Sequence, residues 1–235
     1  MELIFVHGAL VRGGQWWWQR TADLLLERTG IRSRALALPS TGETSPEEQA
    51  GGLGADAAAL RRELDRVDSA IVVGHSYGGT VIAEAGQHPA VRHLLYVSSY
   101  LPDVGQSQAA IMDGESDPVS IADNGDGTLS ASGYDVASFA ARFLQDADAE
   151  AQQQGWERVT AQAAGAFMTP TTAAGWQGVD STYIVCGRDR STSLELQRFH
   201  AARATRAVEL PTGHHPFISR PDLVALQIEA LLQKA

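Results

Sequence analysis

Lysine is almost absent from this chain of 235 residues, because 17 of its 18 basic residues are arginines and the single lysine is Lys234. A lysine one residue from the end of the chain cannot act inside a folded core as a Schiff-base residue or as the phosphate-binding lysine of a P-loop. The one cysteine, Cys186, cannot form an intramolecular disulfide, and no Cys/His spacing predicts a structural zinc site. Lysine chemistry, disulfides and structural zinc are therefore excluded, and the fold depends on its own core.

Long hydrophobic runs and clusters of basic residues are also missing. No segment approaches the roughly 20 apolar residues of a membrane span, and the first residues lack the basic and apolar regions of a signal peptide. The formal net charge is −10, whereas binding of nucleic acid requires a basic face. We therefore expect a cytoplasmic protein that binds neither nucleic acid nor a membrane.

Short apolar segments alternate with segments of helical periodicity over most of the chain. The segments that predict buried strands are residues 3–6, 31–38, 70–74, 91–98, 183–186 and 207–210. Helical spacing of apolar residues covers residues 16–28, 55–67, 80–87 and 221–233, while residues 40–54 are polar and turn-forming. Strands separated by helices predict right-handed crossovers and an α/β fold with about six mostly parallel strands and helices on both faces.

Residues 101–178 interrupt this alternation. They contain no segment that predicts a buried strand, and they have helical periodicity from about residue 135 to 166. We expect them to form a helical lid inserted before the last two strands of a core built from residues 1–100 and 179–235. The aspartate-rich stretch at residues 123–128 does not have the spacing of a calcium loop, so a turn or hairpin is the better interpretation.

A candidate nucleophile lies directly after the clearest strand. Residues 74–78 read Gly-His-Ser-Tyr-Gly, which matches the G-x-S-x-G pattern, and a predicted helix follows. A serine on a tight strand-to-helix turn adopts unfavourable backbone angles, and glycines beside it avoid collisions with the neighbouring strand and helix. We therefore predict Ser76 as the nucleophile. The alternative interpretation is an ordinary glycine-rich turn with an exposed serine.

A serine hydroxyl reacts only when a base removes its proton, so a histidine must reach it. His214 and His215 follow the last predicted strand at the same edge of the sheet as Ser76. His75 is adjacent in sequence, but its side chain should point away from that of the serine, and His7 more often shapes the turn after the first strand.

Three other histidines are weaker candidates. His88 and His93 lie near the start of a strand, at the opposite edge, and His200 lies in a polar helix where we expect it at the surface.

The imidazole in turn needs an acid that orients it. Asp189 follows the strand at residues 183–186 at the edge that carries Ser76, and the resulting order of serine, aspartate and histidine is that of an α/β-hydrolase. Asp103 is the alternative acid, and Asp180 precedes its strand at the wrong edge. The backbone N–H groups of Ala9 and Tyr77 are the expected donors of an oxyanion hole.

With these motifs, the sequence resembles the α/β-hydrolase superfamily, and more closely its branch of small plant methylesterases, hydroxynitrile lyases and bacterial carboxylesterases. The resemblance rests on the segments at residues 7–9, 74–79, 187–189 and 213–221 and spans nearly the whole chain. In that branch the catalytic histidine stands seven residues before the proline that opens the final helix. The spacing from His214 to Pro221 fits, whereas that from His215 does not.

Two features bear on the activity that the resemblance implies. Hydroxynitrile lyases of this branch carry a lysine directly after the catalytic histidine, and here that residue is His215, which disfavours cyanohydrin cleavage. Residues 16–18, three tryptophans, should pack the first helix against the sheet. The following residues could line an apolar substrate pocket under the lid: Phe139, Trp156, Phe167, Met168, Trp176 and His215.

We therefore expect a serine carboxylesterase that hydrolyses small to medium hydrophobic esters through an acyl-enzyme and needs no metal or organic cofactor. One alternative keeps the triad and makes the protein a lactonase, cyclase or lyase acting on a natural product. Another is a ligand-sensing receptor with a retained triad that turns over slowly. Covalent labelling of Ser76 without ester turnover would favour the lactonase, cyclase or lyase. A ligand-dependent protein partner would favour the receptor.

Overall fold

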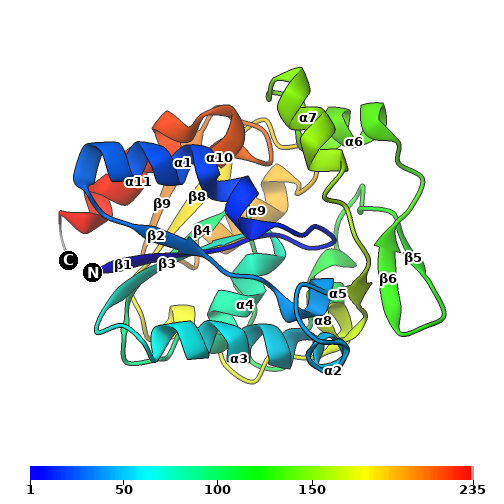
Figure 1. Ribbon diagram of the computed structural model, residues 1–235, viewed down its shortest axis with the longest axis horizontal. Coiled ribbons are helices and arrows are strands. Elements are labelled where there is room, and N and C mark those ends of the chain that lie inside the picture. Colours follow the sequence, from blue (N-terminus) through cyan, green and yellow to red (C-terminus); the bar gives the residue numbers. More distant parts are fainter. Residues whose placement is uncertain (234–235) are drawn as a thin grey trace.

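A parallel sheet of six strands forms the centre of the molecule in the computed structural model, which describes residues 1–233 (Figure 1). In spatial order the strands are β2 (Ser33–Ala35), β1 (Glu2–Val6), β3 (Ala70–His75), β4 (Val91–Val97), β8 (Ser181–Cys186) and β9 (Arg206–Leu210). Every neighbouring pair in this sheet is parallel. The expected α/β fold with six strands is confirmed, while Lys234 lies outside the described residues.

Helices cover both faces of this sheet. One face carries α1 (Gly14–Thr29), α10 (Pro216–Ser219) and α11 (Pro221–Leu232), and the other carries α3 (Gly52–Leu64), α4 (Tyr77–Ala85) and α9 (Leu194–Ala201).

Strand β1 shows why the apolar runs are continuous. Leu3 and Phe5 pack on the side of α1, whereas Ile4 and Val6 pack on the side of α3 and α4. A strand that is buried on both faces has no polar side to alternate with.

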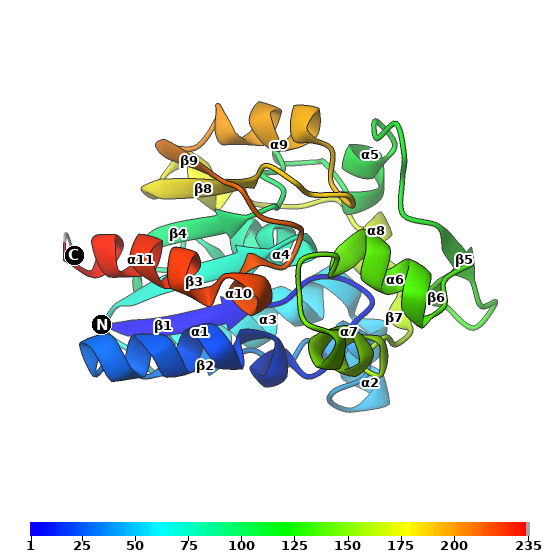
Figure 2. The ribbon, with the colours of Figure 1, turned by 90° about the horizontal axis from the view of Figure 1, so that it is seen from above.

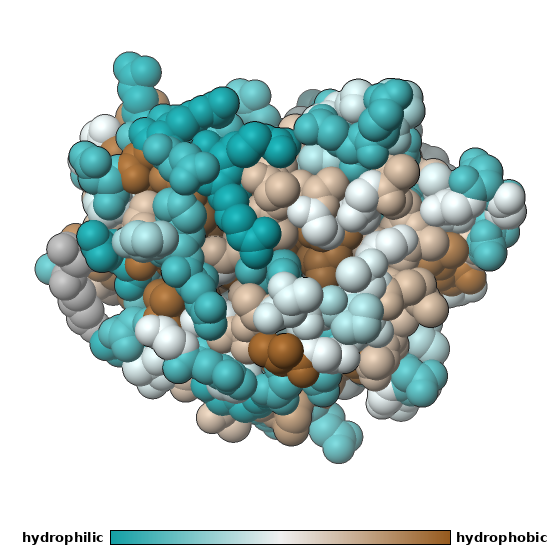
Figure 3. Space-filling model, turned by 90° about the horizontal axis from the view of Figure 1, so that it is seen from below, coloured by the Kyte–Doolittle hydropathy of each residue, from teal (hydrophilic) through white to brown (hydrophobic). Residues whose placement is uncertain are grey.

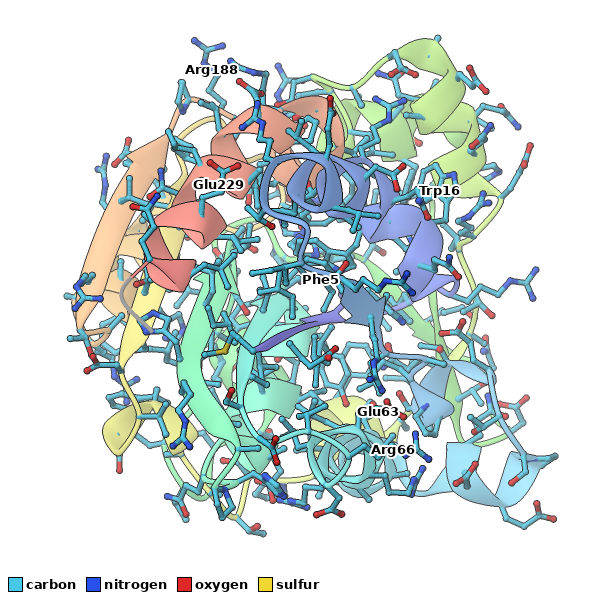
Figure 4. The ribbon with its side chains drawn as sticks, turned by 60° about the vertical axis from the view of Figure 1, so that its left-hand side comes forward. Phe5, Trp16, Glu63, Arg66, Arg188 and Glu229 are labelled. Atoms are coloured by element: carbon cyan, nitrogen blue, oxygen red, sulfur yellow. The ribbon has the colours of Figure 1, made fainter. Side chains whose placement is uncertain are left out.

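Aromatic residues attach α1 to the sheet, as the tryptophan run predicts. The ring of Trp18 stacks on that of Phe5 with centroids 4.6 Å apart, and both residues are fully buried. Figure 4 shows Phe5 beneath α1 and Trp16 at the start of the same helix, beside the insertion. The Trp16 indole N–H donates to Gln154 Oε1 over 2.7 Å. The helix ends at Gly30, whose φ of 70° lets its N–H donate to the carbonyl of Leu26.

Most of residues 101–178, called the insertion below, lies beyond the carboxyl ends of the sheet strands (Figure 2), and its last residues pack along α4. The insertion contains these elements: α5 (Gln108–Met112), β5 (Ile121–Asp123), β6 (Thr128–Ala131), α6 (Val136–Phe143), α7 (Ala149–Trp156), β7 (Gln162–Ala163), α8 (Gly165–Met168) and the 3-10 helix η2 (Gly175–Gln177).

The insertion is not purely helical, in contrast to the expectation. β5, β6 and β7 form a small antiparallel sheet, and β5 and β6 are joined by the aspartate-rich turn, which is therefore a hairpin. Gly125 and Gly127 provide the positive φ values, 77° and 85°, that this turn requires. β5 and β6 are short and mostly half-buried, and β7 has only two residues, so none of the three has the apolar run that marks the strands of the main sheet.

The helix expected over residues 135–166 is shorter in the structure than its apolar spacing predicts. The predicted helix over residues 135–166 is interrupted after Phe143, and α7 starts anew at Asp148, whose carboxylate accepts the N–H of Ala151 over 2.8 Å. Conversely, the segment around residues 40–54, which was expected to form turns, contains helices. These are the 3-10 helix η1 (Pro39–Thr41), α2 (Pro46–Ala50) and the start of α3. Capping side chains set these boundaries more strongly than the apolar spacing did.

The surface carries both hydrophilic and hydrophobic side chains. On the face seen in Figure 3, hydrophobic side chains form only small patches between hydrophilic ones. Glu63 and Arg66 form an ion pair on the outer side of α3, where Figure 4 labels them. Within residues 1–233, no helix has both the length and the apolar character needed to cross a membrane.

Candidate active site

Ser76 occupies a strained turn between β3 and α4. Its φ of 51° and ψ of −124° lie outside the regions that L residues normally adopt. A Cβ at Gly74 would lie 2.7 Å from the carbonyl oxygen of Gly78, and one at Gly78 would lie 2.5 Å from that of Val6. The glycines are therefore required by close backbone contacts, as the motif predicts, and the surroundings hold the serine at the carboxyl edge of the sheet.

His214 and Asp189 are hydrogen bonded at the same edge. His214 Nδ1 lies 2.8 Å from Asp189 Oδ2, and both side chains are buried. An ionised carboxylate only accepts, so Nδ1 carries the proton and Nε2 is left as the basic nitrogen of the neutral ring. His214 and Ser76 line one cavity.

Several donors stabilise Asp189 as an anion. Its Oδ1 accepts the backbone N–H groups of Ser191, over 2.6 Å, and of Thr192, over 3.1 Å. The Ser98 hydroxyl donates to Oδ2 and also lies 3.2 Å from His214 Nδ1. Burial alone would raise the pKa of Asp189, but the charge of His214 and these hydrogen bonds hold that pKa below its usual value.

The alternative acid lies elsewhere. Asp103 forms an ion pair with Arg203 over 2.5 Å and accepts the side-chain amide of Gln177. It makes no hydrogen bond to His214 among residues 1–233. The geometry therefore brings Asp189, and not Asp103, to the histidine.

His200 lies differently from the expectation. His200 is buried, not at the surface, because its face of α9 packs against the loop after β4, where its Nδ1 accepts the N–H of Leu101 over 3.2 Å. His75 lines the cavity and lies against the His214 ring, with centroids 4.5 Å apart. Its Nε2 donates to the carbonyl of His214 over 3.0 Å, so it supports the backbone of the candidate base.

His215 also lies in this cluster, and it is uncharged. Its Nδ1 donates to the carbonyl of Phe143 over 2.8 Å, and its ring stacks on Trp17. Burial, followed by the nearby charge of His214, lowers the pKa of His215 to about 3. It therefore supplies no positive charge at the site where hydroxynitrile lyases carry a lysine.

The three histidines are the one group of at least three possible metal ligands found within residues 1–233. One ring nitrogen of each of His75, His214 and His215 lies within 4.8 Å of the others. Metal-independent chemistry stays our prediction.

The cavity is predominantly apolar and holds about 670 Å³ of space, counting its open mouth. Ala9, Leu10 and Val11 of the loop after β1 contribute to its apolar lining, and the insertion contributes the rest: Met112, Val119, Ile121, Ala131, Phe139, Phe143, Val159 and Phe167.

Only part of the predicted pocket lines this cavity. Phe139, Phe167 and His215 do, but the other three predicted side chains do not. Trp156 packs against the outer side of Phe139, with ring centroids 5.6 Å apart, and Met168 points outward with 62% of its surface exposed.

Trp176 is the third pocket residue that was placed wrongly. Its indole N–H donates to the carbonyl of Pro102 over 2.7 Å, and the guanidinium of Arg203 lies over its ring. These contacts hold it beside the loop after β4 and outside the cavity.

Backbone donors lie on two sides of Ser76. Ala9, in the loop after β1, and Tyr77, the first residue of α4, both line the cavity. The N–H of neither residue donates to another group among residues 1–233. Both N–H groups are therefore free of other partners in this part of the chain, and their role as oxyanion donors stays a prediction.

Sequence reasoning missed polar residues after β4. Ser98 contacts both Asp189 and His214. Tyr100 lines the cavity, and burial raises its pKa to about 12, so its hydroxyl stays protonated beside Ser76. The signal was present, because both residues follow a buried strand at the carboxyl edge of the sheet.

Comparison with known proteins identifies the family of the fold. The sequence profile described as "Alpha/beta hydrolase family" matches residues 3–227. The chain is 26% identical over 212 residues to the probable hydrolase R7 of Phoma sp., covering 84% of this chain and 85% of that protein. It is 26% identical over an alignment of 254 residues to a carbendazim hydrolyzing esterase of Nocardioides sp., covering 98% and 99%.

A solved structure shows the same fold. The pyrethroid hydrolase of Sphingobium faniae JZ-2 superposes with a TM-score of 0.81 at 22% identity, covering 98% of this chain and 96% of that chain.

Proposed function

The chain belongs to the alpha/beta hydrolase family and is an enzyme of the hydrolase type, and from this premise we propose that it is a serine carboxylesterase acting on small to medium hydrophobic esters. One observation carries the proposal: His214, which is hydrogen bonded to Asp189, and the strained Ser76 line the same apolar cavity. Relatives named as a carbendazim hydrolyzing esterase and a pyrethroid hydrolase support a small-molecule substrate.

In the proposed reaction, Ser76 Oγ attacks the ester carbonyl while His214 Nε2 accepts its proton. The oxyanion is held by the N–H groups of Ala9 and Tyr77. His214 then returns the proton to the leaving alcohol, which departs and leaves the acyl group on Ser76. A water molecule, activated by the same histidine, attacks the acyl carbonyl and releases the acid. Asp189 stabilises the imidazolium in both halves without being protonated.

The cavity lining supports hydrophobic esters over charged substrates. Apolar side chains from the insertion surround the serine, so we propose that residues 101–178 act as a lid that sets acyl and alcohol preference. The uncharged His215 argues against cyanohydrin cleavage, because cyanide release needs a cation that this side chain does not provide.

A panel of p-nitrophenyl and alkyl esters, varied in acyl length and in alcohol size, tests this function. We expect turnover of short and medium acyl chains by the wild type. Ser76→Ala should lower kcat at least about 10⁴-fold with an unchanged circular dichroism spectrum. Wild-type rates in Ser76→Ala, or no ester turnover by a wild type whose serine reacts with a fluorophosphonate, would contradict the proposal.

A further inference from the structure

The loop that carries the first proposed oxyanion donor is held in an unfavourable backbone conformation. Leu10, directly after Ala9, has a φ of 59°, which L residues other than Asn and Asp rarely adopt. Such a conformation persists only where the surroundings impose it. Two hydrogen bonds do so: the N–H of Thr160 donates to the Leu10 carbonyl over 2.9 Å, and the Leu10 N–H donates to Gln162 Oε1 over 2.8 Å.

Both partners of Leu10 belong to the insertion. Arg12 and Val11 extend the contact, because the Arg12 N–H donates to the Arg158 carbonyl over 2.9 Å and Val11 forms an antiparallel bridge with Val159. The insertion therefore holds the loop after β1 from outside the main sheet.

The side chain of Gln162 continues inward through buried polar groups. Its Nε2 donates to Ser40 Oγ over 2.8 Å, and the Ser40 hydroxyl donates to Asp56 Oδ2 over 2.6 Å. All three side chains are inaccessible to solvent. An amide NH₂ can only donate, so the Ser40 hydroxyl accepts from Gln162 and donates its own proton to the Asp56 carboxylate. The donor and the acceptor of each of these hydrogen bonds are therefore fixed.

This series of hydrogen bonds ends at Tyr77, the second proposed oxyanion donor. The Tyr77 hydroxyl donates to Asp56 Oδ2 over 2.7 Å, and the Ser40 N–H donates to Oδ1 over 2.9 Å. Burial and the charge of Asp56 raise the pKa of Tyr77 well above its usual value, so this hydroxyl remains a donor. Tyr77 is the residue that follows Ser76.

We propose that Gln162, Ser40 and Asp56 are positioning residues that hold the loop of Ala9 and the backbone of Tyr77 at a fixed separation. This inference rests on the proposed function, which assigns the N–H groups of Ala9 and Tyr77 to the oxyanion. One end of the hydrogen-bonded chain is anchored next to Ala9 and the other on the side chain of Tyr77. Oxyanion donors stabilise the transition state only when they are already in place. The hydrogen bonds from Gln162 to Tyr77 therefore lower the activation free energy and do not strengthen substrate binding.

The first test replaces Gln162 by leucine, which removes both of its hydrogen bonds at similar size. Active sites are counted by the endpoint of fluorophosphonate labelling, so a misfolded fraction does not lower the rate per site. We expect kcat per labelled site to fall about 10- to 100-fold, less than the loss seen when an oxyanion donor is deleted outright. KM should change less than threefold.

A trifluoromethyl ketone inhibitor gives a readout that a merely structural role would not move. It forms a tetrahedral adduct with the serine, and the adduct oxygen occupies the oxyanion site. Its affinity should weaken by the same factor as kcat/KM in Gln162→Leu and in Ser40→Ala. The matched control is Ser181→Ala, which removes a buried serine hydroxyl that accepts the Thr205 N–H over 3.2 Å at the amino end of β8. In this variant, kcat per site and inhibitor affinity should match the wild type.

A third variant adds a pH signature. In Q162E the protonated carboxyl can accept from Leu10 and donate to Ser40 as the amide does, whereas the ionised form has no donor. The rate of Q162E relative to wild type should therefore rise as the pH is lowered.

Rates per labelled site within twofold of wild type in both Gln162→Leu and Ser40→Ala would overturn the positioning role. A ratio for Q162E that does not change with pH would overturn it as well. Failure of the fluorophosphonate to label Ser76 would instead refute the proposed function itself.

Discussion

Replacing Asp189 by asparagine tests the orientation of the candidate base, and the structure defines what the substitution does. Two backbone N–H groups, from Ser191 and Thr192, point at Oδ1. Backbone donors cannot rotate away, so the asparagine carbonyl oxygen must stay there. The asparagine NH₂ then occupies the position of Oδ2 and faces His214 Nδ1, which lay 2.8 Å from the carboxylate.

An amide donor at this position reverses the tautomer of the ring. His214 has to accept at Nδ1, so its proton moves to Nε2, the nitrogen that should remove the proton of Ser76. The imidazolium that forms during the reaction also loses its counter-charge. We expect kcat to fall about 10³- to 10⁴-fold, which corresponds to roughly 4 to 5.5 kcal/mol in the activation free energy.

The assay is steady-state hydrolysis of p-nitrophenyl acetate, normalised to sites labelled by a fluorophosphonate under forcing conditions. Asp103→Asn is the matched control, because Asp103 lies on the same side of the fold but pairs with Arg203. Its rate should remain within twofold of wild type. A loss below tenfold in Asp189→Asn, or a larger loss in Asp103→Asn, would refute the reasoning.

Three further predictions follow from single contacts. Ser98→Ala removes the hydroxyl shared by Asp189 and His214 and should lower kcat per site about 3- to 10-fold; an unchanged kcat would contradict its role. Burial lowers the pKa of His200 to about 3 in the folded protein, from 6.5 in the unfolded chain. As the pH falls below 6.5, His200 is protonated in the unfolded chain but not in the folded protein, so the free energy of unfolding decreases. Between pH 6.5 and 5 the loss from this group is about 2 kcal/mol, and urea unfolding of His200→Gln should show a pH dependence weaker by that amount. Phe167→Ala enlarges the cavity and should shift the acyl preference to longer chains, by about fourfold in kcat/KM per added methylene, whereas Met168→Ala, on the exposed side of α8, should not.

The core of the fold and the positions of its main strands could be predicted because their signals are local, although the strand expected at residues 31–38 is only Ser33–Ala35. A strand buried on both faces must be a continuous apolar run, and the strand before Ser76 is one. The glycines beside Ser76 follow from close backbone contacts, which any serine at such a turn would meet. Asp189 and His214 follow their strands directly, so the parallel sheet alone brings them to one edge.

Side-chain direction in the insertion could not be predicted in the same way. Its helices are short, and whether Phe167 or its neighbour Met168 faces the cavity depends on how α8 docks against α3 and α5. His200 was misplaced for a related reason, because the polar composition of its helix hides the face that packs on the loop after β4. Tertiary contacts determine the direction of these side chains, and the local sequence does not indicate it.

The buried chain from Gln162 to Asp56 shows the same limit. Ser40 lies in a stretch that reads as a polar turn, and Gln162 lies in one that reads as helix. Neither position has a motif, and their hydrogen bond joins residues 122 positions apart.

The most direct test of the account is to trap the acyl-enzyme. Wild-type protein is mixed with an excess of p-nitrophenyl ester, quenched in acid and digested, and the peptides are read by mass spectrometry. The account predicts one acyl group on the peptide that contains Ser76, formed as fast as the first equivalent of p-nitrophenol is released and absent in Ser76→Ala. An acyl group on another residue at that rate, or full ester turnover by Ser76→Ala, would contradict it.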